Sequence, residues 1–402
     1  MPKVIVSGVT SCENRGVEAL VTSIAFGLRD CGGACRMTVL TQTPDHDRAL
    51  APGDGIEWVA DPFVLSRSWS HARPAEPPSQ AAERAHALLA SADLVLTTGG
   101  DLHTSAYGVS TSYLAAPSAA LDKGVPVAMI AHSIGPFTDA GERRAFTAAA
   151  RRSAILTVRE QASLDYATTS LGLEGSVVSL TADPAFLLPA APPGRVDQIL
   201  ASSGIGPDQP YLCLAPSRGI AGFRQLDHAS HLAALLRLTG ELRRKWGLPI
   251  VAIPHVHDSR PANDDRRLVA ELAAAAAGGL RPLSGGLTAA EYKGVVSRSA
   301  LLIAERLHAA IAGLSSAVPT VAIGYSPKFA GVLAGAYGPA ISPEDVHIDV
   351  RAFVSDEAAA RRLLGNLDIE DLRRHLRERL PLVLGRAREN FALAWQAMGG
   401  TR

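Results

Sequence analysis

Residues 300–314 read Ala-Leu-Leu-Ile-Ala-Glu-Arg-Leu-His-Ala-Ala-Ile-Ala-Gly-Leu, and residues 318–328 read Val-Pro-Thr-Val-Ala-Ile-Gly-Tyr-Ser-Pro-Lys. The first stretch is a short apolar run followed by charged residues and then by an Ala- and Leu-rich segment. The second stretch is another apolar run that is again followed by polar residues. This pattern predicts a strand, a helix and a second strand, with charged side chains where each strand stops.

In open α/β sheets, ligands bind outside the carboxyl ends of the strands. The side chains that we expect at such a site are Glu305, Arg306, His308, Tyr325 and Lys328. The planar guanidinium of arginine matches a phosphate or a carboxylate, and lysine adds a point charge. The sequence therefore predicts an anionic substrate.

The composition is that of a globular protein with 402 residues, of which 47% are apolar and 19% are charged. This length is sufficient for two domains. Lys plus Arg and Asp plus Glu each number 39, so bulk charge favours neither nucleic acid nor an anionic membrane as a partner. The chain has no leader-like start and no apolar run of about 20 residues, from which we expect a cytoplasmic protein without an integral membrane segment.

Apolar runs alternate with helical patterns along the chain, which predicts parallel sheets covered by helices on both faces. We expect an N-terminal α/β domain over residues 1–188, a Pro- and Gly-rich linker over 189–210 and a C-terminal α/β domain over 211–402. The final helix, near 389–398, is a candidate to return to the first domain. The predicted fold class is α/β, with two doubly wound, Rossmann-like domains facing a cleft, an arrangement that resembles the GT-B architecture.

Polar residues follow the first strands of the N-terminal domain. Asn14 and Glu18 lie where a helix begins. Either Asn14 caps the helix and its N-terminus holds an anion, or the segment is only a capping box with charges that face solvent. Gly99, Gly100 and Asp101 follow the strand that ends near residue 98, and paired glycines allow either a close approach to a ligand or a tight turn.

Further candidates follow later strands. His132 is expected at a strand end, where a histidine can transfer protons or be structural. Arg159 either binds an anion or pairs with nearby carboxylates. Ser217 and Arg218 in the second domain suit a carboxylate or a phosphate. His255 and His257 lack a third ligand at a diagnostic spacing, so a surface loop is favoured over a metal site.

The chain resembles the polysaccharide pyruvyl transferase family. Arg306 and His308 match the family's Arg-x-His at a helix start, and Tyr325 and Lys328 match its Tyr-x-x-Lys after the next strand. The family's Asn-x-Gly-Asp-Glu-Ala segment is matched from Asn14 onwards, although the sequence has Val17 where the family has Asp. Weaker matches are the family's Gly-x-Gly-Pro segment after His132, its Val-Arg-Asp/Glu at Arg159 and its Asp-Pro-Ala at 183–185.

The resemblance implies that phosphoenolpyruvate is the donor and that a sugar or glycan is the acceptor. The product it implies is a pyruvate ketal or, as in some members, a related enolpyruvyl-type adduct. It implies donor binding by Arg306 and Lys328, with Arg159 or Arg218 as further cations. Ketal formation begins with protonation of the enol methylene, for which His308 is the expected acid. His132 or Glu305 would accept the proton of the hydroxyl, and the sequence leaves open the exchange of these acid and base assignments. Neither a metal nor a cofactor is expected, because arginines can stabilise the charge.

A nucleotide-sugar glycosyltransferase of GT-B architecture is the alternative. Such enzymes often carry Glu-x7-Glu in the second domain, but the position that corresponds to Glu305 is Gly313. A family member without activity, acting as a binding subunit, is a third possibility because of Val17. The acceptor and the oligomeric state are not readable from the sequence, and the Pro- and Ser-rich segment 44–80 is our candidate for acceptor specificity.

Overall fold

The computed structural model describes residues 1–50, 55–64, 78–107, 111–276, 278–365 and 367–399. The chain divides into two compact units. Unit 1 comprises Met1–Glu13, Leu20–Leu187 and Val383–Arg402, and unit 2 comprises Asn14–Ala19 and Leu188–Leu382. The six residues Asn14–Ala19 therefore belong to unit 2, although they lie near the N-terminus.

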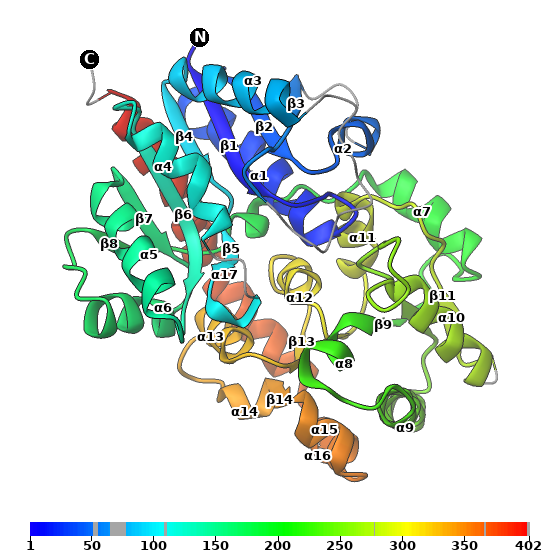
Figure 1. Cartoon of the computed structure of the whole chain (residues 1–402). Coiled ribbons are helices and arrows are strands. Elements are labelled where there is room, and N and C mark those ends of the chain that lie inside the picture. The colour runs from blue at the N-terminus through cyan, green and yellow to red at the C-terminus, as the bar shows by residue number, and fades with distance from the viewer. Residues whose placement is uncertain (51–54, 65–77, 108–110, 277, 366, 400–402) are drawn as a thin grey trace. The chain divides into compact units, whose positions relative to one another are not determined.

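Unit 1 is built on a parallel sheet (Figure 1). Its strands are β1 (Lys3–Val9), β2 (Arg36–Thr41), β3 (Ile56–Ala60), β4 (Leu94–Thr97), β5 (Gly100–His103), β6 (Val127–Ile134), β7 (Ile155–Val158) and β8 (Val178–Leu180). The strand order is β3-β2-β1-β4-β6-β7-β8, and β5 also pairs with β6. All residues of β6 are buried, as expected for a strand with helices on both faces.

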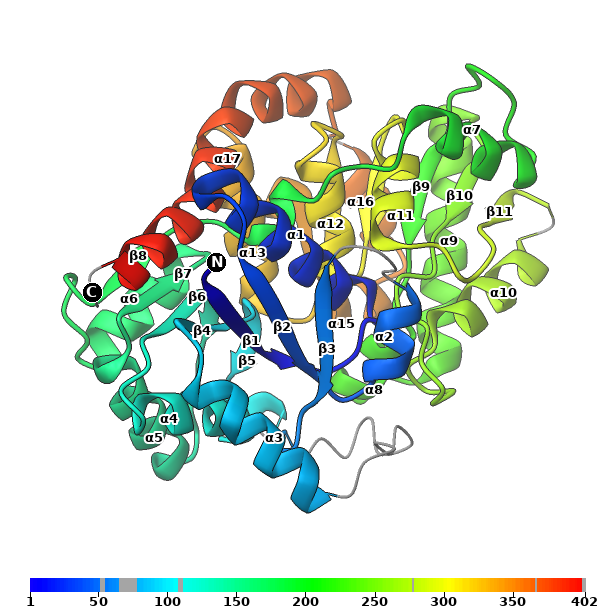
Figure 2. The same ribbon diagram turned by 90° about the horizontal axis from the view of Figure 1, so that it is seen from above.

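Helices cover both faces of this sheet. They are α1 (Arg15–Gly32), α2 (Pro44–Leu50), α3 (Pro78–Ala90), α4 (Ala115–Leu121), α5 (Ala140–Arg152), α6 (Gln161–Asp165) and the end of α17 (Ile369–Gly399). Short 3-10 or π turns span Ser105–Tyr107, Ser112–Leu114, Tyr166–Ser170 and Pro184–Leu187. Helices α3, α4 and α5 lie on one face, and α1 and the end of α17 lie on the other (Figure 2).

The end of α17 is part of the core of unit 1. Phe391 is fully buried, and a Cβ added to Gly27 of α1 would overlap its ring. Asn390 is also fully buried, and its Oδ1 accepts hydrogen bonds from Thr157 (2.5 Å) and Thr181 (2.9 Å). The last helix thus packs into unit 1, to which its segment from Val383 onwards belongs.

Unit 2 is built on a second parallel sheet. Its strands are β9 (Leu212–Ala215), β10 (Ile250–Ala252), β11 (Leu280–Pro282), β12 (Leu302–Ala304), β13 (Thr320–Gly324) and β14 (His347–Asp349), in the order β11-β10-β9-β12-β13-β14. Its helices are α7 (Pro193–Ser202), α8 (Arg218–Arg224), α9 (His228–Trp246), α10 (Asp265–Ala275), α11 (Ala289–Val296), α12 (Leu307–Leu314), α13 (Pro327–Tyr337), α14 (Pro343–Val346), α15 (Val350–Ser355), α16 (Ala359–Gly365) and the first part of α17.

Apolar residues form a core on each face of this second sheet. Leu238 of α9 and Leu268 of α10 are buried in one of them. Val196 of α7, Tyr292 of α11 and Ala309 of α12 are buried in the other. The two layers hold the strands rigidly, so that the polar residues after them have fixed positions.

The predicted fold class of two α/β domains with parallel sheets is confirmed. The segment 189–210, predicted as a linker, contains α7 and belongs to unit 2. Its Pro-rich start suggested a loop, but Pro193 occupies the first turn of the helix, where no backbone donor is needed. The short strands β11 and β14 were not predicted, because their residues, Leu280–Pro282 and His347–Asp349, do not form an apolar run.

The Pro- and Ser-rich segment 44–80, our candidate for acceptor specificity, contains α2, β3 and the start of α3. Residues 51–54 and 65–77 of it lie outside the described part of the chain. Among the described helices, none combines the length and the apolar composition that a bilayer crossing requires.

Candidate functional site

The polar residues of unit 2 gather where three neighbouring strands end. Strands β10, β9 and β12 are adjacent, and they end at Ala252, Ala215 and Ala304. The segments after them carry, in that order, His255 and His257, Ser217 and Arg218, and Glu305 and Arg306. Asn14 forms an isolated antiparallel bridge with Val256, which places the first turn of α1 beside the same segments. We call Arg15, His255, His257, Arg306 and His308 the Arg–His cluster.

Arg306 is held rigidly by a buried carboxylate. Its Nε and Nη2 donate to the two carboxylate oxygens of Asp265, at 3.0 and 2.7 Å, and Nη2 also donates to Asn263 Oδ1 at 3.3 Å. Burial disfavours the charge of Arg306, but Asp265 outweighs burial and raises the guanidinium's pKa. Within the described residues Nη1 has no hydrogen-bond partner, so this end of the guanidinium is available to a ligand.

Arg15 joins the cluster from the first turn of α1. Its Nη2 donates to His257 Nδ1 at 3.0 Å, and its backbone N–H donates to the carbonyl of His255 at 3.1 Å. Glu18 lies 3.3 Å from Nη1 and supplies a counter-charge. Arg15 was not among the site residues predicted from the sequence. The position of Arg15 in the motif after β1 could have marked it as a candidate site residue. Its proximity to His257, however, arises only from the fold.

The hydrogen bonds of His257 fix its tautomer. Because arginine is only a donor, Nδ1 must accept, and the ring proton must lie on Nε2. Nε2 lies 2.9 Å from the carbonyl of Pro254 and 3.0 Å from the hydroxyl of Tyr292. Burial and then the charge of Arg15 lower the pKa of His257 to about 4, so the ring is neutral at pH 7.

His255 is the most enclosed imidazole of the cluster. It is 4% exposed, and burial followed by the charges of His308, Arg306 and Arg15 lowers its pKa well below the ordinary value. The prediction of a surface loop at His255 and His257 is therefore wrong, because both side chains are buried beside the sheet. Across the described ranges, no group of three or more His, Cys, Asp or Glu side chains is arranged as a metal site.

His308 extends from the first turn of α12 and is half-buried. A Cβ added to Gly16 would overlap its ring, so the imidazole packs directly on the backbone of α1. The predicted pair Arg306 and His308 is thus joined by Arg15 and His255 in one region of unit 2.

Glu305, predicted as a catalytic residue, has a structural environment. It is fully buried, and its two oxygens contact His231 Nε2 at 2.7 Å and the backbone N–H of Ser217 at 2.7 Å. Burial disfavours the charge of His231, but Glu305 raises its pKa. Because both carboxylate oxygens of Glu305 are engaged, the structure argues against its taking a substrate proton. Ser217, buried beside it, is the N-cap of α8.

Other predicted cations have protein partners. Arg218 Nη1 donates to Glu271 at 2.7 Å, and the backbone N–H of Arg218 donates to Asp265 at 2.9 Å. Lys328 lies in the first turn of α13, half-buried, at the end of β13. Tyr325 precedes that helix and stacks on Phe223 with a ring separation of 5.6 Å and an angle of 15°.

Asn14 and Glu18 hold the start of α1. Asn14 Oδ1 accepts from the backbone N–H of Gly16 at 2.9 Å. Glu18 Oε1 accepts from the backbone N–H of Ala289 at 3.0 Å, at the N-terminus of α11. The structure favours the capping alternative for Asn14 and a counter-charge role for Glu18.

Two predicted site residues of unit 1 are enclosed. His132 lies inside β6 and not after it, is fully buried, and contacts Thr97 Oγ1 through Nε2 at 2.6 Å. Arg159 is buried and donates to Asp183 at 2.6 Å and to Ser133 at 2.8 Å. The pairing alternative for Arg159 is therefore the one that the structure favours, and His132 lacks the exposure that a proton acceptor needs.

The glycine turn of unit 1 follows β4. Gly99 is buried, and a Cβ there would lie 3.0 Å from the carbonyl of Ala131. Gly100 has φ = +101°, a conformation that favours glycine. Asp101 lies in β5 and is half-buried. Tight packing is thus sufficient to explain both glycines.

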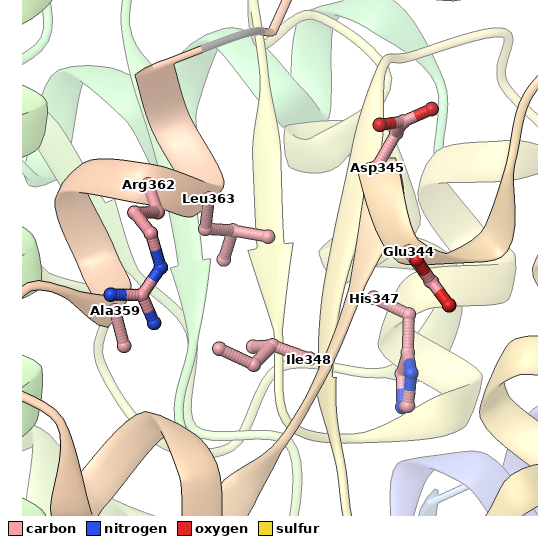
Figure 3. Close-up of a pocket in the computed structure, with 7 residues that line it drawn as sticks. All are labelled: Glu344, Asp345, His347, Ile348, Ala359, Arg362 and Leu363. Atoms are coloured by element: carbon pink, nitrogen blue, oxygen red, sulfur yellow. The ribbon is translucent and has the colours of Figure 1, made fainter.

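A separate pocket of about 170 Å³ lies at the outer strand of the second sheet (Figure 3). It is lined by Glu344, Asp345, His347, Ile348, Ala359, Arg362 and Leu363. No residue of the Arg–His cluster contributes to it.

Solved structures share the architecture of this chain. The UDP-GlcNAc 2-epimerase from Neisseria meningitidis bound to UDP-GlcNAc is 13% identical, with a TM-score of 0.57 and coverage of 97% of this chain and 98% of that chain. The S. aureus MnaA structure with UDP is 12% identical, with a TM-score of 0.59 and coverage of 97% and 94%. The trehalose 6-phosphate synthase from Burkholderia multivorans is 13% identical, with a TM-score of 0.55 and coverage of 100% of both chains.

These identities show the fold alone, which is of the GT-B type. A search of curated protein sequences finds no significant match. The model of the polysaccharide pyruvyl transferase family matches residues 20–327, which is more than half of the chain. The chain belongs to this family of transferases, as the motifs around Arg306 and Lys328 predicted.

Proposed function

We propose that the protein transfers the pyruvyl group of phosphoenolpyruvate to hydroxyls of a sugar or glycan, forming a pyruvate ketal and releasing phosphate. Family membership supports polysaccharide pyruvylation in general. The observation that carries the donor assignment is the Arg–His cluster, in which Asp265 orients Arg306 beside His308, Arg15 and His255. A cytoplasmic location and independence of a metal or cofactor belong to the same proposal.

Phosphoenolpyruvate carries a phosphate and a carboxylate, so its site needs several fixed cationic donors. Arg306 offers Nη1 at low entropic cost, because its other nitrogens are already held. Lys328 follows β13, the strand next to β12, and adds a point charge near the same sheet edge. Arg15 is the third cation in this proposal. Arg159, which the sequence also suggested, is excluded because Asp183 neutralises its charge in unit 1.

The chemistry begins with proton transfer from His308 to the methylene carbon of the enol. This step makes a methyl group and an oxocarbenium-like carbon, to which a sugar hydroxyl adds as its proton passes to the now neutral imidazole of His308. Phosphate then leaves with the bonding electrons, and a second hydroxyl closes the ketal as the released phosphate takes up its proton. A general acid of this kind typically contributes about 10²–10⁴-fold. Neutral His255 and His257 keep further positive charge away from the developing cation.

Calorimetry with the full-length protein tests the donor. Phosphoenolpyruvate and UDP are titrated separately into wild type, into Arg306→Ala and into Arg361→Ala, whose side chain is 71% exposed on α16. We expect phosphoenolpyruvate to bind wild type and Arg361→Ala alike, and Arg306→Ala to bind at least about tenfold more weakly. Binding of UDP alone would instead establish the nucleotide-sugar glycosyltransferase, and equal binding by all three proteins would remove Arg306 from the site.

A further inference from the structure

Phe223 of α8 is an exposed aromatic side chain in unit 2. Among the described residues three large apolar side chains are exposed, and Phe223, at 51%, is the aromatic one of the three. Its ring stacks on that of Tyr325, with centroids 5.6 Å apart and an angle of 15° between the planes. Parallel rings at this separation are offset, so Tyr325 covers only part of one face of Phe223. The other face is therefore open to solvent.

Tyr325 gives this stack a rigid base. It is half-buried after β13, and it packs edge-on against Phe329, with centroids 5.7 Å apart and an angle of 62°. Phe329 belongs to α13 and is 3% exposed. Because Phe223 rests on these rings, it offers a flat surface that is already in place before a ligand binds, and this lowers the entropic cost of binding.

The stack lies beside Arg306. In the second sheet β12 lies between β9 and β13. Helix α8 follows β9 and Tyr325 follows β13, so the two rings meet across the end of β12, after which Arg306 comes. A Cβ added to Gly219 of α8 would lie 3.5 Å from Arg306 Nη2. Gly219 and Phe223 are four residues apart, so they share the face of α8 that is turned to Arg306.

An uncharged aromatic face next to a cationic site favours a neutral ligand with an apolar side. The face of an aromatic ring carries partial negative charge, so it attracts the weakly positive C–H groups of a ligand. A pyranose ring has such C–H groups on its face and hydroxyl groups around its rim. From Gly219 to Phe223 the helix rises about 6 Å, so a sugar ring on Phe223 can reach back toward Arg306 with its hydroxyl rim.

We propose that the stacked rings of Phe223 and Tyr325 form the platform on which the acceptor sugar lies, within unit 2 and next to Arg306. The identity of the ligand rests on the proposed function, and membership of the polysaccharide pyruvyl transferase family supports a sugar. The C–H face of the pyranose packs on the open face of Phe223. Its hydroxyl rim is then directed at the phosphoenolpyruvate that Arg306 holds.

Saturation-transfer NMR on the full-length protein tests the platform with four probes: the methyl glycosides of galactose, mannose, glucose and N-acetylglucosamine. We expect wild type to bind at least one of them, with most saturation reaching the C–H protons of one ring face. Phe223→Ala and Phe223→Leu lack an aromatic face and should weaken that binding about fivefold or more, whereas Phe223→Tyr should bind as wild type does. Leu382→Ala removes an apolar side chain that is 45% exposed, and this matched control should leave binding unchanged.

Calorimetry with phosphoenolpyruvate separates this proposal from the donor assignment. Phe223→Ala should bind the donor as wild type does, because Phe223 lies outside the Arg–His cluster. Glycoside binding that depends on Phe223 supports the platform even where phosphoenolpyruvate fails to bind wild type, a result that would refute the donor alone. Three results overturn the platform: no glycoside binds wild type, Phe223→Ala or Phe223→Leu binds as well as wild type, or Phe223→Ala abolishes the binding of UDP instead.

Discussion

Asp265 accepts two hydrogen bonds from Arg306, of 3.0 Å from Nε and 2.7 Å from Nη2, and both side chains are largely enclosed in unit 2. Burial raises the pKa of Asp265, and the charge of Arg306 opposes that rise. The pair therefore acts as one unit, in which the carboxylate sets the direction of the guanidinium.

Asp265→Asn should lower the affinity for phosphoenolpyruvate about tenfold and the free energy of unfolding by about 3 kcal/mol, because it leaves Arg306 without its counter-charge. Calorimetry and urea unfolding measure the two effects. Asp197→Asn, an exposed carboxylate paired with Arg298, should change neither. Undiminished affinity in Asp265→Asn would show that Arg306 does not need this partner to bind the donor.

Gly16→Ala should displace the ring of His308, because the new Cβ would overlap it. We expect kcat to fall more than the affinity for phosphoenolpyruvate, since the acid is moved while Arg306 stays in place. Gly240→Ala is the control, because Gly240 lies in α9 and a Cβ added there has no other atom within 4 Å. This variant should raise the free energy of unfolding by up to about 1 kcal/mol, since alanine favours a helix more than glycine does. If Gly16→Ala and Gly240→Ala were equally active, His308 would not be the residue that transfers the proton.

Because the pKa of His257 is lowered, we expect the free energy of unfolding to fall in weak acid. Its pKa is about 4 in the folded protein, below the ordinary value of about 6.5, so between these values the unfolded chain binds more protons. The contribution to stability is therefore complete above about pH 6.5 and is lost as the pH falls to about 4, by up to about 3 kcal/mol.

His257→Asn, which keeps an acceptor for Arg15, tests this linkage. Urea unfolding of wild type and variant at pH 7, 6, 5 and 4 should show a smaller loss in the variant, and the difference isolates His257 from the other titrating groups. Identical slopes would show that the imidazole stays accessible to protons in the folded protein.

Glu305→Gln should act on folding and not on donor binding. The variant removes the counter-charge of His231, whose pKa Glu305 raises. In wild type, the stabilisation of the fold by this ion pair is therefore complete below about pH 6.5. It is lost as the pH rises through the higher pKa that His231 has in the folded protein. At pH 6 we expect a loss of about 2 kcal/mol in the free energy of unfolding, with unchanged affinity for phosphoenolpyruvate. A large loss of affinity for phosphoenolpyruvate with an unchanged free energy of unfolding would show that Glu305 takes part in donor binding.

The sequence by itself determined the two α/β domains and the positions of Arg306, His308 and Lys328 at strand ends. Long apolar runs alternating with helical patterns specify parallel sheets, and such local patterns need no knowledge of distant contacts. The family motifs lie in the same segments, so the class of transferase could also be recognised from them.

The tertiary structure decided which polar residues are available. Glu305 and Arg159 were indistinguishable in sequence from ligand-binding residues, yet each is neutralised by a partner far along the chain, His231 and Asp183. The pairing of Arg15 with His257, 242 residues apart, and the stacking of Phe223 on Tyr325 also arise only from packing. A buried charge is defined by the groups that surround it, and the fold alone brings those groups together.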